Sequence, residues 1–276
     1  MRWGCTAPVS QFEADYAAML LYVEPGPIQP PSGELHQDTR RMGGQAMTRR
    51  DAPWFVCVPV YTVPIPQNRW GQDRQNFISV YHDEAGVIVV GGNTKLQPLW
   101  STFTVGDTGL LAHTPGEEEL DFGPVAGLTH CPEAAVLGSS DESPAVELRY
   151  GDTICRVEVR LTPEAATLVY TAGDGGGGAV AAHVSLVPRV GEALRSAAKA
   201  QVLGEEAIDR MTAAAETIAH AGWALDIPAA SRVRWPVLPH NPYRKDGAVT
   251  LEEARLVVSL PLEAGASAEV VLRVGD

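Results

Sequence analysis

The sequence is short of cysteine, of positive charge and of long apolar runs, and each shortage excludes a class of protein. The four cysteines, Cys5, Cys57, Cys131 and Cys155, form no C-x-x-C pair, which argues against a zinc ribbon or a thioredoxin-type redox site. With 21 Lys and Arg against 34 Asp and Glu, the net charge of -13 repels nucleic acid and anionic membrane surfaces. No apolar run is long enough to span a bilayer, and no secretory signal is visible. We therefore expect a soluble protein, and the sequence does not assign its cellular location.

Familiar catalytic signatures are missing as well. The sequence has no GxSxG, HExxH or Walker A motif, and the glycine run at 175–178 lacks the features of a phosphate-binding loop. Two carboxylates such as Asp73 and Glu84 could serve a glycosidase, but 34 acidic residues make some such pair unavoidable. We expect no cofactor and no metal.

Short β-branched and aromatic segments separated by turn residues make up most of the chain from Trp54 onward. The clearest is 153–161, where apolar and charged residues largely alternate, as in a strand with one buried and one wet face. Strands are expected over 54–61, 78–82, 87–90, 101–105, 109–113, 145–150, 153–161, 166–171, 179–187, 223–227, 232–237, 254–260 and 268–274. This pattern predicts an all-β fold, an antiparallel sandwich or barrel.

The first 50 residues have a different texture. Apolar residues from Val9 to Leu20 recur at helical spacing and predict a short helix, and the prolines of 24–32 predict an extended linker. A basic cluster follows, either as a solvated face or as the lining of a groove, at Arg40, Arg41, Arg49 and Arg50. We expect an N-terminal segment with its linker over 1–50 and a β-sandwich domain over 51–276.

Two later segments leave alternatives open. The Ala, Glu and Arg content of 191–220 favours a helix, but Gly204 interrupts it and its neighbours in sequence are all strands. The segment Trp235–Gly247, WPVLPHNPYRKDG, has three prolines that fix the backbone. It is either a structural corner with a satisfied His240 or a loop at a cleft.

The stretch from Arg69 to Phe103 carries the densest mix of charged, amide and aromatic residues. Its centre predicts a hairpin, with strands at 78–82 and 87–90 joined by the turn 83–86. If the hairpin is tight, polar residues at its two ends lie together, where they can bond the hydroxyl or acidic groups of a sugar. The candidate substrate-binding residues are Arg69, Trp70, Arg74, Gln75, Asn76, Asn93, Lys95 and Gln97. Alternatively, the arginines pair with nearby aspartates and only hold the base of the hairpin.

Tyr81 and His82 end the first hairpin strand and should point to opposite faces of it, one toward the core and one outward. His82 alternates with Glu84, so the two could share a metal with a third ligand such as His113, His130 or His183. A solvated turn explains the same residues, and we favour that interpretation.

The run RWGQDRQNFISVYHDEAGVIVVGGNTKLQPLWSTF resembles the β-sandwich portion of heparinase II/III-like proteins, in which an arginine-rich approach leads into a hairpin, a glycine pair and an Asn-x-Lys segment. The C-terminal run ARLVVSLPLEAGASAEVVLRV fits the end of such a sandwich. The resemblance covers the chain from Trp54 onward and implies an antiparallel supersandwich similar to the galactose-mutarotase-like fold. In lyases of this type an α/α toroid precedes the sandwich, and a tyrosine and a histidine mediate β-elimination. The resemblance makes Tyr81 and His82 the catalytic candidates.

The leading hypothesis is a carbohydrate-binding or carbohydrate-processing sandwich module of a heparinase II/III-like polysaccharide lyase, without its catalytic toroid. Its partner would be an acidic polysaccharide or oligosaccharide, and a helical domain or partner chain would complete the cleft. One alternative is a stand-alone enzyme, a lyase or a mutarotase-like epimerase, with a histidine and a carboxylate as acid and base. The other is a purely structural sandwich that docks to a helical domain.

Overall fold

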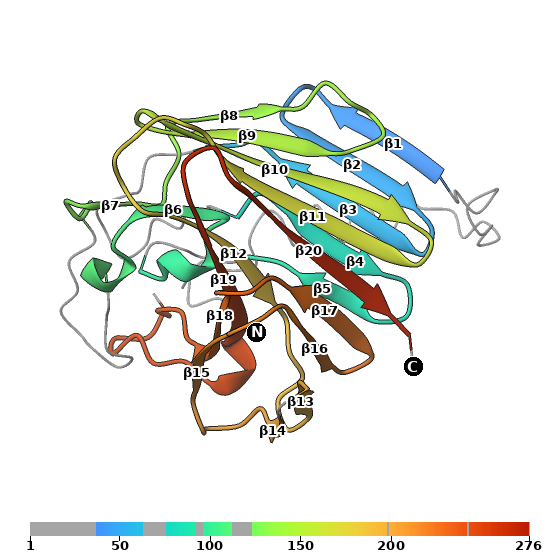
Figure 1. Ribbon diagram of the computed structural model, residues 1–276, viewed down its shortest axis with the longest axis vertical. Coiled ribbons are helices and arrows are strands. Elements are labelled where there is room, and N and C mark those ends of the chain that lie inside the picture. The colour runs from blue at the N-terminus through green and yellow to red at the C-terminus, as the bar shows by residue number, and fades with distance from the viewer. Residues whose placement is uncertain are drawn as a thin grey trace, which may run out of the picture. The chain divides into compact units, whose positions relative to one another are not determined.

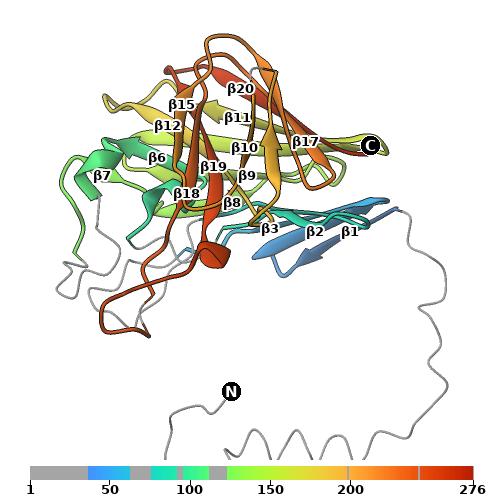
Figure 2. The same cartoon turned by 90° about the horizontal axis from the view of Figure 1, so that it is seen from below.

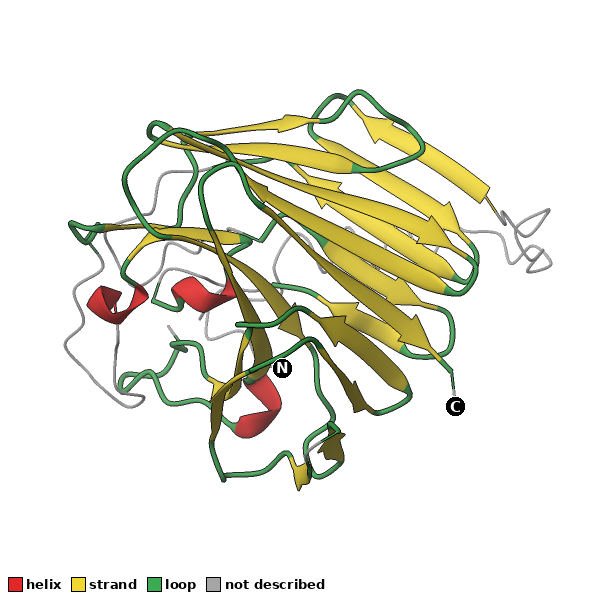
Figure 3. Ribbon diagram, in the orientation of Figure 1, coloured by secondary structure: helices red, strands yellow, loops and turns green. Residues whose placement is uncertain are grey.

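Alternating apolar side chains place the strands in two antiparallel sheets that pack face to face (Figure 1). The computed structural model describes residues 37–62, 76–91, 96–111, 123–197, 199–241 and 243–275, all within one unit that spans 35–276. Strands dominate this part, and its helices are short 3-10 turns (Figure 3), η1 (Pro98–Trp100), η2 (Thr108–Leu111) and η3 (Leu251–Glu253). None of these described turns has the length or the apolar character to cross a membrane. The expected all-β sandwich is confirmed.

The first sheet has eleven strands within the described residues. Its main path runs through β1 (Gln37–Met42), β2 (Ala46–Asp51), β3 (Trp54–Pro59), β4 (Ser79–His82), β5 (Gly86–Val89), β12 (Val180–Leu186), β19 (Arg255–Leu262), β18 (Arg232–Val237) and β15 (Ile208–Met211). Off this path, β6 (Phe103–Gly106) pairs with β12 and with β7 (Leu128–Thr129). The strands β5 and β6 pair with opposite ends of β12, and η1, which lies between them in sequence, contacts β12 and β19.

The second sheet has nine strands in the described part of the chain. In spatial order they are β14 (Ala200–Val202), β13 (Ala193–Arg195), β16 (Glu216–His220), β17 (Trp223–Ile227), β20 (Ser267–Val274), β11 (Ala165–Ala172), β10 (Thr153–Thr162), β9 (Ala145–Tyr150) and β8 (Ala134–Leu137). Figure 2 shows β1 to β3 of the first sheet as a layer beneath β8 to β11 of the second.

The expected meander of β9, β10 and β11 is present, with its strand bounds shifted by one residue at most. Val157 and Val159 on β10 face the core, while Glu158 between them accepts hydrogen bonds from Arg156 and Arg160 on the outer surface. Ile154 departs from the expected pattern, because it is exposed and Cys155 is buried in its place. The thiols of Cys57 and Cys155 are free.

The two sheets are joined in the core by aromatic contacts. Phe103 of β6 is fully buried, and its ring meets Tyr170 of β11 edge-on at a centroid distance of 5.7 Å and Tyr150 of β9 at 6.5 Å. Edge-to-face pairs of this kind stabilise beyond the area that they bury.

Two expectations need correction, and one open alternative is decided. The strand expected at 109–113 is not formed where the chain is described, because Asp107 Oδ1 accepts the N–H of Gly109 at 2.8 Å and turns the backbone into η2. Of the two alternatives left open for 191–220, helix and strand, the described residues form strands, β13 to β16. The polar residues 37–51 form the β1–β2 hairpin, which belongs to the first sheet although it precedes the expected start of the sandwich at 51. The helix expected at 9–20 and the linker at 24–32 lie outside the described residues.

We expect Phe103→Ala to lower the free energy of unfolding by about 3–5 kcal/mol, because it leaves a cavity between the sheets and removes both ring contacts. Urea unfolding followed by tryptophan fluorescence measures the change. Tyr81→Ala, at a partly exposed position, should cost less than about 1 kcal/mol. Equal losses in the two variants would show that Phe103 does not join the sheets.

Candidate functional site

The residues expected to bind substrate are only partly visible. Arg69, Trp70, Arg74, Gln75, Asn93 and Lys95 lie outside the described residues. The Asn76 side chain is used within the protein, since its Nδ2 donates to the carbonyl of Trp100 at 3.3 Å and its Oδ1 accepts the N–H of Ile78 at 3.2 Å. Gln97 lines a pocket together with residues of β15 and β18.

Tyr81 and His82 point to opposite faces of β4, as expected from strand geometry. His82 is buried, its ring lies edge-on to Trp54 at 4.6 Å, and its Nδ1 accepts the N–H of Glu84 at 3.2 Å. Burial lowers the pKa of His82 below its ordinary value. The two side chains therefore do not share one surface, and Tyr81 is the outward-facing member. Asp83 beside them pairs with both guanidinium nitrogens of Arg50, at 2.7 and 2.5 Å.

The outer face of the first sheet, which points away from the second sheet, carries a row of polar side chains from five strands. Strand alternation places them there, because their neighbours in sequence face the core. The row consists of Thr104 on β6, His183 on β12, Ser259 on β19, Arg234 on β18 and Asp209 on β15. We call these five residues the polar row.

Each member of the polar row contacts the next. The Oγ1 of Thr104 and the Nε2 of His183 share a hydrogen bond of 3.0 Å, and the Nδ1 of His183 shares one of 2.9 Å with the Oγ of Ser259. Arg234 donates to the same Ser259 oxygen at 3.4 Å, and its Nε lies 3.7 Å from Asp209 Oδ1. The row thus runs from a buried end at Thr104 to an accessible end at Asp209.

Burial decides the charge at the inner end of the row. Burial lowers the pKa of His183 to about 3. The positive charge of Arg234 lowers this pKa further, and so does the electrostatic effect of the neighbouring His130. Burial also lowers the pKa of His130 to about 4. Both rings are therefore neutral at pH 7, and the hydroxyls of Thr104 and Ser259 hold the His183 ring in one orientation.

The outer end of the row carries fixed charges. Arg232 donates to both carboxylate oxygens of Asp209, at 2.6 and 2.7 Å, and this hydrogen bond holds the pKa of Asp209 below its usual range. Arg234 is more buried than Arg232, and this burial lowers the pKa of its guanidinium. Two guanidinium groups thus face one carboxylate.

A pocket of about 330 Å³ opens at this end of the row. Its lining residues are Gln97, Leu99, Ala207, Ile208, Asp209, Arg234, Trp235, Pro236, Val237 and Leu238. The register of β18 shifts between Arg234 and Val237, where Pro236 lacks an N–H for the ladder. Gln97 is tied to the end of β18, because its Nε2 donates to the carbonyl of Leu238 at 2.7 Å. The pocket combines a carboxylate, a guanidinium and an amide with an apolar floor.

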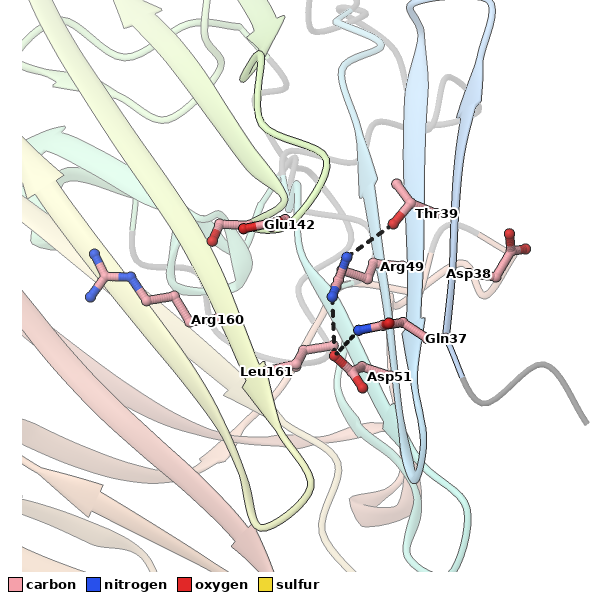
Figure 4. Close-up of a pocket in the computed structure, with 9 residues that line it drawn as sticks. Gln37, Asp38, Thr39, Arg49, Asp51, Glu142, Arg160 and Leu161 are labelled. Carbon is pink, nitrogen blue, oxygen red and sulfur yellow. Dashed lines mark hydrogen bonds and ion pairs between the residues drawn. The ribbon is translucent and has the colours of Figure 1, made fainter.

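A larger cleft of about 700 Å³ lies between the sheets near β1 and β2 (Figure 4). Arg49 occupies it but is committed within the protein, because it donates to Thr39 Oγ1 at 3.1 Å, to Asp51 Oδ2 at 3.1 Å and to the carbonyl of Asp141 at 3.0 Å. Arg41 donates to the Asp141 side chain at 2.7 Å. These two arginines tie the β8–β9 loop of the second sheet to the first sheet. In the basic cluster, Arg49 thus lines a groove, whereas Arg40 is solvated.

The polar row was not found from the sequence, although one signal for it was present. In VAAHVSL, the residues at alternate positions are apolar and face the core, which leaves His183 and Ser185 on the other face. Polar residues that alternate with apolar residues in a strand without charges indicate a polar face that is shielded from solvent. Within the described residues, no group of three or more His, Cys, Asp or Glu side chains is placed to hold a metal ion.

No protein-family model and no curated protein sequence matches this chain. Among solved structures, it is similar to a candidate aldose 1-epimerase from Escherichia coli, with 11% identity and a TM-score of 0.45, over 87% of this chain and 98% of that one. It is similar to heparinase III, with 12% identity and a TM-score of 0.45, over 83% of this chain and 35% of that one. A 4-alpha-glucanotransferase from Thermococcus litoralis gives 8% identity and a TM-score of 0.49, over 87% of this chain and 39% of that one.

These structural neighbours include the family that the sequence resembles, and by their names they are sugar-processing enzymes. The chain spans nearly all of the epimerase but only about a third of heparinase III. The similarity is partial, so the function of this chain has to be inferred from its own residues.

The neutral state of His183 gives a test of the polar row by pH. Unfolded histidine titrates near pH 6.5, whereas folded His183 titrates at about 3, so between these values only the unfolded chain binds the proton. Above pH 6.5 the His183 ring is neutral in both states and costs no stability. Below that pH, it should lower the free energy of unfolding by about 1.4 kcal/mol per pH unit. His183→Gln should lower the slope of unfolding free energy against pH, measured by urea unfolding, by that amount. An unchanged slope would show that His183 titrates normally in the fold.

Proposed function

We propose that the pocket at the outer end of the polar row binds one ring of a carbohydrate. The observation that carries this proposal is the convergence of Gln97, Asp209 and Arg234 on one pocket with an apolar floor. An ionised carboxylate accepts hydrogen bonds from sugar hydroxyls, and guanidinium and amide groups donate to hydroxyl or acidic oxygens. Apolar lining residues pack against the C–H groups of the ring.

The charge at the pocket supports an acidic sugar as the ligand class. Arg232 and Arg234 share the single carboxylate of Asp209, so guanidinium groups outnumber carboxylates in this cluster of three side chains. The partial burial of Arg234 strengthens a hydrogen bond to an anionic group, because less water competes for it. In this proposal the first sheet supplies one wall of a binding cleft, and a helical domain or a partner chain is a candidate for the other wall.

The geometry favours binding over catalysis at this pocket. Among the described lining residues, the charged groups are Asp209 and Arg234, and the Asp209 pKa lies below its usual range because Arg232 hydrogen-bonds to it. A general acid needs a pKa near the working pH, and a carboxyl held in its ionised form does not meet that need. The neutral histidines sit at the buried end of the row.

Isothermal titration with a uronic-acid oligosaccharide, and with a neutral oligosaccharide of equal length, tests the proposal. We expect tighter binding of the acidic ligand and a loss of about tenfold to a hundredfold in Arg234→Ala, because charge-assisted hydrogen bonds contribute about 1.5–3 kcal/mol. Arg234→Lys should retain part of the affinity, since it keeps the charge without the planar fork.

Arg156→Ala is the matched control, because Arg156 is a surface arginine on the second sheet whose partner is Glu158. It should leave binding unchanged. A wild-type protein that binds neither oligosaccharide would refute the proposed function. Equal affinity of Arg234→Ala and wild type for the acidic ligand would show that Arg234 does not contact it.

A further inference from the structure

The loop between β18 and β19 begins at the wall of the pocket. Leu238 lines the pocket and its carbonyl accepts the hydrogen bond from Gln97 at 2.7 Å. From there the loop extends on the side of the first sheet that faces away from the second sheet (Figure 2). Tyr243 follows Leu238 by five residues, so the chain allows at most roughly 18 Å between their Cα atoms.

The tip of this loop is held in one conformation by its own hydrogen bonds. Asn241 Oδ1 accepts the N–H of Tyr243 at 3.0 Å, and the backbone N–H of Asn241 donates to the carbonyl of Gly247 at 3.0 Å. His240 is buried beneath the tip, and its ring lies so close to Gly247 that an added Cβ there would be 2.1 Å from it. Gly247 also has a φ of +64°, which glycine adopts without strain. The segment 235–247 is thus a corner with a buried histidine, and its first four residues line the pocket.

This ordered tip displays an aromatic ring to solvent. Tyr243 is 79% exposed, which is the largest value among the exposed large hydrophobic residues in the described part of the chain. Arg244 beside it is exposed as well. An exposed ring gains little within the free protein, but a ring on a fixed backbone loses little conformational entropy when it contacts a ligand.

We propose that Tyr243 is a stacking platform for a further ring of the carbohydrate held in the pocket, so that the protein binds oligosaccharides more tightly than monosaccharides. This inference rests on the proposed function. The aromatic face packs on the C–H face of the sugar ring, and the phenol hydroxyl stays in water or bonds a sugar hydroxyl. The pocket holds one ring and Tyr243 holds another along the same chain.

Titration with a uronic-acid monosaccharide and a hexasaccharide tests the platform. We expect Tyr243→Ala to weaken hexasaccharide binding about threefold to tenfold and to leave monosaccharide binding unchanged, because only the longer ligand reaches the ring. Tyr243→Phe should bind the hexasaccharide within about twofold of wild type, since it keeps the ring. Tyr61→Ala, another exposed tyrosine that follows β3 in the other half of the sheet, should have no effect.

The outcomes separate the two proposals. Unchanged hexasaccharide affinity in Tyr243→Ala, together with the loss in Arg234→Ala, would overturn the platform and leave the pocket intact. Equal weakening of the monosaccharide and the hexasaccharide would also overturn it, since Tyr243 would then act on the pocket itself. A wild-type protein that binds no sugar of either length would refute both the platform and the proposed function.

Discussion

The two hydrogen bonds of the His183 ring determine how the outer face of the first sheet is built. A buried imidazole must find a partner for each nitrogen, because an unmade hydrogen bond inside a protein costs about 1–3 kcal/mol. Thr104 and Ser259 supply these partners from the strands on either side of β12. This requirement keeps three strands in register on the outer face, in addition to the apolar packing on their inner faces.

The hydrogen bond between His183 and Ser259 also orders the site, because His183 and Arg234 both bond to the Ser259 hydroxyl. This hydroxyl meets His183 on one side and Arg234 on the other, so the position of the guanidinium depends on the imidazole two strands away. Arg234 in turn lies between Ser259 and Asp209, and Arg232 fixes Asp209 from the accessible side. The charged groups at the pocket are therefore held from both ends of the row. Such preorganisation lowers the entropy lost when a ligand binds.

The sequence predicts the strands with apolar alternation far better than it predicts this site. The bounds of β17 and β18 agree with the expected ranges, because both strands face the core on alternate residues between clear turn residues. By contrast, β1 and β2 are rich in arginine, and Arg41 and Arg49 donate to the β8–β9 loop, which no local pattern reveals. The polar row escapes prediction because its five residues come from five strands and meet only through the sheet topology. Gln97 is a candidate from its residue type alone, whereas its place at the pocket depends on Leu238, 141 residues away in sequence.

The overall acidity of the chain and the Arg234 guanidinium at the pocket act over different distances. The net charge of -13 surrounds the protein with a field that repels an anionic ligand. Salt screens exposed charges beyond about 8 Å at physiological ionic strength. Arg234 acts at contact distance and is partly shielded from water, so its attraction is screened much less. An acidic sugar would therefore gain affinity from a few short contacts and little from long-range attraction. For such a ligand, each added contact matters, and the stacking that we propose on Tyr243 supplies one that is independent of charge.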